Sequence, residues 1–113
     1  MEALFDKMKV YTKMEEEIAA EEFQAYYKSV MDKLQKDFDA LSQEELIWGK
    51  IIVSVMAGNA SSRQKRKDVD SKKFKKILEK SKFWSDAIVY RLKKNGLSEK
   101  EIETLTQETE AGM

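Results

Sequence analysis

The sequence contains no proline and only four glycines among its 113 residues. An all-β domain needs frequent turns, and proline and glycine are the residues that most often form them. Long helices need neither residue in their interiors. The scarcity of both therefore argues against a sheet protein and favours a few long helices.

Cysteine and histidine are also absent. The chain therefore has no disulfide, no thiolate or imidazole ligand for a metal ion, and no imidazole base. Acidic runs such as Glu15–Glu17 have the pattern of solvated helix faces, and no D-x-D-x-D-G loop is present. We expect no catalytic residue, no metal or cofactor site and no small-molecule substrate, and we do not expect an enzyme.

No hydrophobic run is long enough to cross a bilayer. The most apolar segment, Leu46–Ala57, includes Lys50, whereas a bilayer core of about 30 Å needs about 20 apolar residues. The opening residues, MEALFDKMKV, are acidic and polar from the second position, unlike a secretory signal peptide. We therefore expect a cytoplasmic protein without a membrane partner.

Hydrophobic residues make up 42% of the chain and charged residues 37%, a balance that suits a soluble helical domain. We predict one all-α domain over residues 1–108, a small bundle of about four helices, followed by a disordered acidic tail at 109–113. Residues 58–70, GNASSRQKRKDVD, have one sizeable apolar side chain. This segment is predicted to form a mobile basic loop.

The first predicted helix is the longest and covers residues 2–41. Its apolar side chains form two stripes at helical spacing, Leu4–Ile18 and Phe23–Leu41. The step of five residues between the stripes puts them out of phase. TKME at Thr12–Glu15 has the pattern of a capping box, which would start a new helix. The helix therefore either buries different faces at its two ends or is split near Thr12.

The second predicted helix covers residues 43–57. Ser42 and Glu45 have the spacing of a capping box, and Gly58-Asn59 is suited to the left-handed conformation that follows a helix. The segment IWGKIIVSVMAGN is apolar on nearly every side, and its β-branched run would also suit a buried strand. We favour a helix because no other segment could pair with such a strand. A helix of this kind belongs in the middle of a bundle or at an oligomer interface.

The third and fourth helices are predicted at residues 71–95 and 99–108. Gly96 fits the position just after the third helix, and Ser98 with Glu101 gives a second capping-box pattern. The apolar stripes of the helices together define the expected core. The side chains predicted to be buried include Phe23, Tyr27, Leu34, Leu46, Ile47, Trp48, Ile51, Val55, Phe74, Leu78, Ile88 and Leu92.

Although the net charge is zero, the charged residues form three blocks along the sequence, of which the middle one is basic and the other two are acidic. Residues 1–62 carry 7 basic and 12 acidic side chains, residues 63–94 carry 13 and 4, and residues 95–113 carry 1 and 5. In the basic block, lysines and aromatic rings share a face of the third predicted helix, and such a face can neutralise phosphates and stack on unpaired bases. The candidate nucleic-acid-binding residues are Arg63, Lys65, Arg66, Lys67, Lys72, Lys76, Lys80, Tyr90 and Lys94.

The same residues allow a second interpretation. The acidic runs Glu15–Glu17 and Glu21–Glu22 could form ion pairs with the lysines inside the molecule, and Phe83 and Tyr90 could be buried against the first helix. Burial of both rings would exclude base stacking. We expect Phe83 to be mostly buried and Tyr90 to be partly exposed.

The amount of apolar surface on the predicted helices indicates that the chain assembles with another chain. The second helix is apolar all round and the first has two apolar faces, which is more apolar surface than a monomer of this size easily hides. A homo-oligomer or a complex with a partner protein would cover the remainder. The leading hypothesis is therefore a non-catalytic helical interaction protein, such as an adaptor, inhibitor or assembly factor. The alternative is a nucleic-acid-binding accessory protein that uses residues 63–94.

Overall fold

The computed structural model describes residues 1–66 and 71–113. Over these residues the fold is all-α, as predicted, with one short 3-10 turn and no strand. It has five α-helices where about four were predicted, because the first predicted helix is interrupted. The elements are α1 (Glu2–Thr12), α2 (Ala20–Asp37), the 3-10 turn η1 (Phe38–Ala40), α3 (Gln43–Gln64), α4 (Ser71–Lys94) and α5 (Glu99–Ala111).

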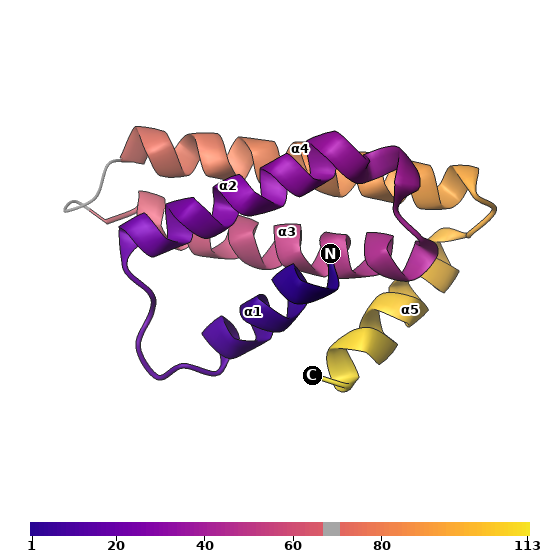
Figure 1. Ribbon diagram of the computed structural model, residues 1–113, viewed down its shortest axis with the longest axis horizontal. Coiled ribbons are helices and arrows are strands. Elements are labelled where there is room, and N and C mark those ends of the chain that lie inside the picture. Colours follow the sequence, from indigo (N-terminus) through magenta and orange to yellow (C-terminus); the bar gives the residue numbers. More distant parts are fainter. Residues whose placement is uncertain (67–70) are drawn as a thin grey trace.

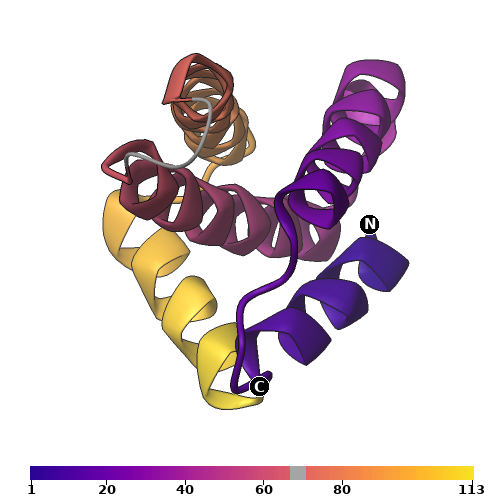
Figure 2. The same cartoon turned by 90° about the vertical axis from the view of Figure 1, so that its left-hand side faces the viewer.

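Helix α3 lies at the centre of the molecule (Figure 1). Seen from its end, α2 and α4 lie on one side of α3, and α1 and α5 lie on the other (Figure 2). The molecule is elongated, with extents of 44 × 26 × 23 Å. A helix covered on both sides must be apolar around its circumference, which explains the composition of the segment around IWGKIIVSVMAGN.

The interruption of the first predicted helix explains its two apolar stripes. Helix α1 ends at Thr12, whose Oγ1 donates a hydrogen bond to the Lys9 carbonyl oxygen at 3.0 Å. A connector, residues 13–19, then leads to α2, which begins at Ala20. Because the connector separates the two helices, each orients its own apolar stripe and the stripes need not be in phase. The split near Thr12 is confirmed, but the capping-box pattern there ends one helix and does not start another.

Two predicted helix starts and one predicted helix end are confirmed. The Ser42 and Glu45 side chains each accept a hydrogen bond of 3.1 Å from the other residue's backbone amide. Ser98 and Glu101 form the same reciprocal pair at the start of α5. Gly96 ends the turn after α4 with φ at +101°, a conformation that side-chain-bearing residues rarely adopt.

The prediction that Gly58-Asn59 ends the helix and opens a loop is wrong. Both residues lie inside α3, which continues to Gln64. Ala60 and Arg63, on the added turns, are 0% and 3% exposed. Their burial against the other helices outweighs the weak helix propensity of glycine and asparagine. Only the part of the predicted loop after Gln64 lacks helical structure among the described residues.

The C-terminal helix is also longer than predicted. Helix α5 runs to Ala111, three residues beyond the expected end at 108. Thr109 Oγ1 donates a hydrogen bond of 2.8 Å to the Leu105 carbonyl oxygen within these last turns. Part of the segment predicted as an acidic tail is therefore helical.

The predicted core is largely correct. Most of the expected side chains are buried: Phe23, Leu34, Leu46, Ile47, Ile51, Phe74, Ile88 and Leu92. Four others are half-buried and pack against this core: Tyr27, Trp48, Val55 and Leu78. Trp48 stays half-buried because it lies between α3 and the short α1, where it stacks on Phe5 with the ring centroids 5.8 Å apart.

Candidate interaction surface on helix α4

Helix α4 is amphipathic and buries one face against the rest of the molecule. The buried side chains are Phe74, Ile77, Ser81, Ile88 and Leu92. Their spacing of three, four or seven residues places them on one side of the helix. The opposite side of α4 is therefore left facing solvent, and the lysines of this helix are exposed on it.

The solvent side carries two exposed aromatic rings. Phe83 is 61% exposed and Tyr90 is 70% exposed. The expectation for Tyr90 is confirmed, whereas the expectation that Phe83 is mostly buried is wrong. The neighbouring ring, Trp84, makes the contact on that side instead, with its centroid 5.4 Å from that of Phe38. Because successive helix residues point 100° apart, burial of Trp84 turns Phe83 outward.

Phe83 is supported by the rings beneath it. Phe83 meets the edge of Trp84 at a centroid distance of 5.4 Å, and Trp84 in turn contacts Phe38. Arg91 fixes the 3-10 turn that carries Phe38 by donating hydrogen bonds to the Phe38 and Asp39 carbonyl oxygens at 3.1 and 3.0 Å. A chain of ring contacts thus connects the exposed Phe83 to the interior.

Three lysines share the solvent side with the two rings. Lys76, Lys80 and Lys94 are exposed, and their spacing from Phe83 and Tyr90 places all five on one helix face. Within residues 1–66 and 71–113, none of the three lysines forms an ion pair. We call this set, Lys76, Lys80, Phe83, Tyr90 and Lys94, the α4 outer face. Lys72 is also exposed at the start of the helix, where it has contacts of its own.

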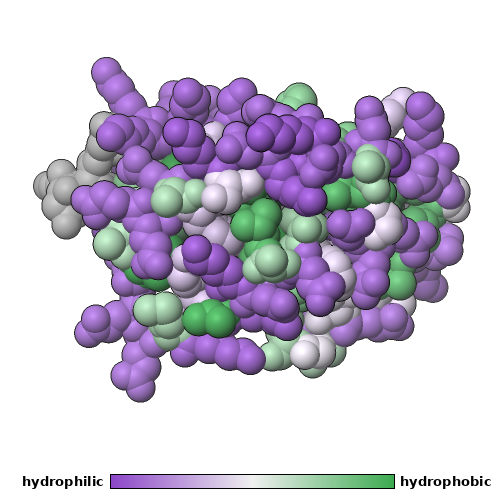
Figure 3. All heavy atoms as spheres, in the orientation of Figure 1, coloured by the Kyte–Doolittle hydropathy of each residue, from purple (hydrophilic) through white to green (hydrophobic). Residues whose placement is uncertain are grey.

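The space-filling view shows the face of the molecule on which α2 lies in front of α4 (Figures 1 and 3). Hydrophilic side chains dominate the upper edge of this face, and apolar side chains appear between them as small patches.

Two of the acidic residues predicted to neutralise the lysines, Glu17 and Glu22, have other partners. Glu17 binds Arg66, which donates one hydrogen bond at 2.9 Å to Oε2 and a second to Oε1. This hydrogen bonding, helped by the nearby Arg63, holds the pKa of Glu17 below its usual value. Glu22 accepts a hydrogen bond of 3.3 Å from the Tyr11 hydroxyl. The intramolecular pairing proposed for the acidic runs therefore involves Arg66 and not the α4 outer face.

Arg63 lies in the interior and does not belong to a nucleic-acid-binding surface. It is 3% exposed, and its Nη2 donates a hydrogen bond of 2.7 Å to the Ile18 carbonyl oxygen. Its guanidinium carbon lies 4.9 Å from the ring centroid of Phe23 and 5.8 Å from that of Phe74. Sequence reasoning missed this role because the extension of α3 that carries Arg63 was read as a loop.

The other candidate residues near the α3–α4 junction divide into two groups. Lys65 is exposed, whereas Arg66 is engaged by Glu17. Lys67 lies outside the described residues. The structure thus brings together the candidates on α4, but it does not extend that cluster to Arg63 and Arg66.

No family model, curated protein or solved structure matches this chain. Within the described residues, no three carboxylates gather as they would around a metal ion. Across residues 1–66 and 71–113, no helix has the length and apolarity that a membrane crossing requires.

Proposed function

We propose that the protein is a non-catalytic helical interaction protein, an adaptor, inhibitor or assembly factor, that binds a partner protein through the α4 outer face. The observation that carries this proposal is the exposure of Phe83 and Tyr90, at 61% and 70%, on one side of one helix. Aromatic side chains are enriched at protein interfaces and often supply most of the binding energy.

Spacing and support favour a binding role for this ring pair. Seven residues of helix separate Phe83 from Tyr90 by about 10 Å, so one partner element can contact both. Fully burying one such side chain contributes about 1.5–3 kcal/mol. The lysines around the rings favour a partner with an acidic surface, because their charges have no ion-pair partner among the described residues.

The structure covers much of the apolar surface from which a homo-oligomer was predicted. The prediction depends on the apolar second helix and on the two apolar faces of the first, but α3 is covered by helices of its own chain, and α1 and α2 each bury apolar side chains. If a second copy used the α4 outer face, the lysines of the two copies would repel each other. Sedimentation at micromolar concentration tests assembly, and a concentration-independent monomer would contradict the homo-oligomer.

Site-specific photo-crosslinking tests the interaction surface itself. A benzophenone amino acid replaces Phe83 or Tyr90 in one set of variants and Thr104 in a control, since Thr104 is exposed on α5. In cells that make the protein, we expect discrete adducts from positions 83 and 90 that protease removes and nuclease does not. Equal adducts from position 104, or none from α4, would contradict the proposal.

A second function, binding of single-stranded nucleic acid, is favoured by a specific observation. Both aromatic rings are exposed beside lysines without ion pairs, so base stacking is sterically open on this helix. Stacking contributes about 1–3 kcal/mol per base, and lysines neutralise phosphates without regard to sequence. The α4 outer face spans about 27 Å from Lys76 to Lys94, enough for several nucleotides.

Fluorescence anisotropy with a labelled 20-nucleotide oligo(dT) and a duplex of the same length tests this alternative. Three phosphate contacts predict that log K falls with log salt concentration with a slope of about −2 for a single strand. Tyr90→Ala should weaken binding to the single strand more than to the duplex. Absence of binding at low salt would leave only the protein-partner proposal.

A further inference from the structure

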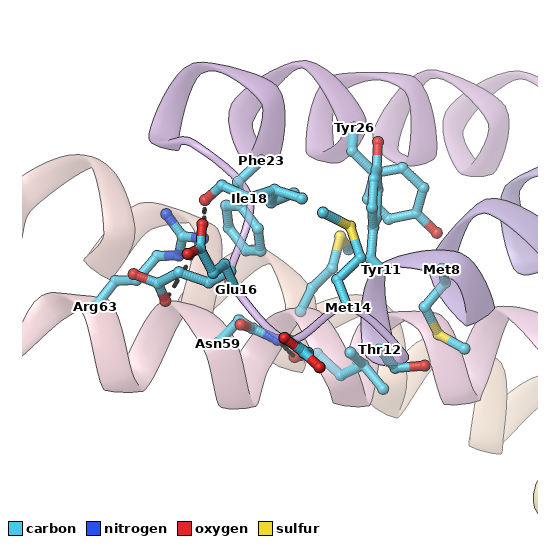
Figure 4. A pocket seen from close by; sticks show the side chains of 14 residues that line it. Met8, Tyr11, Thr12, Met14, Glu16, Ile18, Phe23, Tyr26, Asn59 and Arg63 are labelled. Carbon is cyan, nitrogen blue, oxygen red and sulfur yellow. Dashed lines mark hydrogen bonds and ion pairs between the residues drawn. The ribbon is translucent and has the colours of Figure 1, made fainter.

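A pocket of about 410 Å³ lies beneath the connector between α1 and α2, away from the α4 outer face (Figure 4). It is bounded by the end of α1, the connector, the start of α2 and the last turns of α3. Its walls include the side chains of Met8, Met14, Phe23, Tyr26, Val55 and Met56. Its volume falls in the range of about 300–1,000 Å³ that is usual for small-molecule sites.

Most polar groups in the interior of this pocket are bonded to the chain itself, but Arg63 Nε is buried without a hydrogen-bond partner among the described residues. The Tyr26 hydroxyl donates to the Leu4 carbonyl oxygen at 2.7 Å, and burial raises the Tyr26 pKa. Asn59 Nδ2 donates to the Val55 carbonyl oxygen at 3.2 Å. Arg63 binds the Ile18 carbonyl oxygen. The inner walls therefore offer apolar and aromatic surface to a ligand, together with one unpaired N–H donor at Arg63 Nε.

The mouth of the pocket is acidic. The connector contributes three lining carboxylates, those of Glu15, Glu16 and Glu17. Glu17 is engaged by Arg66 and lies 3.8 Å from Arg63. Glu15 and Glu16 are exposed, and over the described part of the chain neither forms an ion pair or a side-chain hydrogen bond. Two carboxylates at the mouth are thus uncompensated.

We infer that this pocket binds a small organic amine, with its apolar body against the inner walls and its ammonium group between Glu15 and Glu16. The walls supply burial of apolar surface, and the mouth supplies attraction for a cation and repulsion for an anion. Aromatic rings in the walls add favourable contact for the apolar body. Arg63 places one positive charge in the wall, and this charge is offset by Glu17 at 3.8 Å, with the guanidinium held by Ile18 and flanked by Phe23 and Phe74.

The methionines allow the walls to adapt to the body of a ligand. Met8 and Met56 are each 1% exposed, whereas Met14, on the connector, is 48% exposed. A thioether side chain is flexible and packs well against aromatic surfaces of different shape. Met14 can therefore cover a bound apolar group at the side where the pocket is open.

Three probes of nearly the same shape and different charge test the inference: 2-naphthylmethylamine, 2-naphthylmethanol and 2-naphthoate. Each is titrated into protein labelled with ¹³C at the methionine methyl groups. We expect the amine to shift the methyl signals of Met8, Met14 and Met56, and to leave those of Met31 and Met113 unchanged. Because the carboxylates are exposed, the amine should bind about five-fold more tightly than the alcohol, and the carboxylate should bind most weakly.

Charge removal at the mouth supplies the decisive comparison. In the Glu15→Gln/Glu16→Gln variant, the amine and the alcohol should bind with equal affinity. Glu44→Gln/Glu108→Gln removes the same charge from exposed positions outside the pocket and should leave the preference intact. Equal binding of the three probes to the unmodified protein would overturn the amine assignment. Absence of shifts at the three pocket methionines with every probe would overturn the site.

Discussion

The arginines and the lysines of the basic block have different places in the structure. All three arginines of the chain are engaged in contacts within the fold: Arg63 with Ile18, Arg66 with Glu17, and Arg91 with the 3-10 turn. The lysines of the α4 outer face point into solvent. A block that is uniform in charge along the sequence is therefore divided in space between fold and surface.

The difference follows from the chemistry of the two side chains. A guanidinium is planar, has five donors and is weakly hydrated, so it can bind carbonyl oxygens while its faces contact rings. Arg63 and Arg91 both do this, with Phe23 and Phe38 respectively. An ammonium group is strongly hydrated, so a lysine keeps it in water unless an anionic group pairs with it. Substitutions in the two sets should therefore have opposite consequences for stability and binding.

The largest effect is expected from Arg63→Met. The variant loses the hydrogen bond to Ile18 and the contacts with two rings, so the free energy of unfolding should fall by about 2–3 kcal/mol. Urea denaturation followed by circular dichroism measures this loss. Arg63→Lys keeps the positive charge but lacks the planar guanidinium. This variant should therefore recover less than half of the stability that Arg63→Met loses. A loss as small as that of a surface variant would mean that Arg63 does not hold the connector.

Arg91→Gln should have an intermediate effect. Two hydrogen bonds to the carbonyl oxygens of Phe38 and Asp39 are lost at a partly buried position, which should cost about 1–2 kcal/mol. Tryptophan fluorescence should also change, because Trp84 contacts Phe38. Lys93→Gln, two residues further along the same helix, removes a charge from an exposed ion pair and should change stability by less than about 0.5 kcal/mol. Similar losses in both variants would contradict the distinction between arginine and lysine.

Acid should weaken the pair of Glu17 and Arg66. The pKa of Glu17 is lower in the folded chain than its ordinary value of 4.5. Its contribution is therefore complete above about pH 4.5 and is lost as the pH falls from there through the folded pKa. Because both side chains are partly exposed, the contribution should be below about 1 kcal/mol. Arg66→Gln should reduce the slope of stability against pH in this window, and an unchanged slope would contradict the assignment.

The smallest effect on stability is expected from Lys76→Gln/Lys80→Gln/Lys94→Gln. These side chains form no ion pair among the described residues, so the free energy of unfolding should change by less than about 0.5 kcal/mol. The same variant should lose most of the salt-dependent part of any binding to acidic partners. Destabilisation by more than about 1 kcal/mol would show that the lysines belong to the fold, as the arginines do.

Local sequence signals predicted the ends of several helices well. The capping boxes at Ser42 and Ser98 and the glycine at position 96 depend on residues within one turn of each other, so neighbouring residues specify them. The helix end predicted at Gly58 is wrong. Helix α3 continues because helices distant in the sequence bury Ala60 and Arg63 in its last turns. Local propensity is a weak preference that such packing overrides.

The candidate site was predictable only in part. The residues of α4 that share a face follow from helical spacing, and their lysines and rings are visible in the sequence. Which of two neighbouring rings, Phe83 or Trp84, turns inward depends on the position of Phe38 and the 3-10 turn. The pocket beneath the connector joins residues from three helices and has no signature along the chain.

The sequence by itself determined that the chain is helical, where most of its helices begin, and that its charges are arranged in blocks. These properties depend on residues that are neighbours along the chain or along one helix. Only the tertiary structure decided that α3 is covered by its own chain, that the arginines serve the fold, and that Phe83 faces solvent. Each of these outcomes depends on which distant segments compete for the same buried space, and that competition is settled only when the helices pack together.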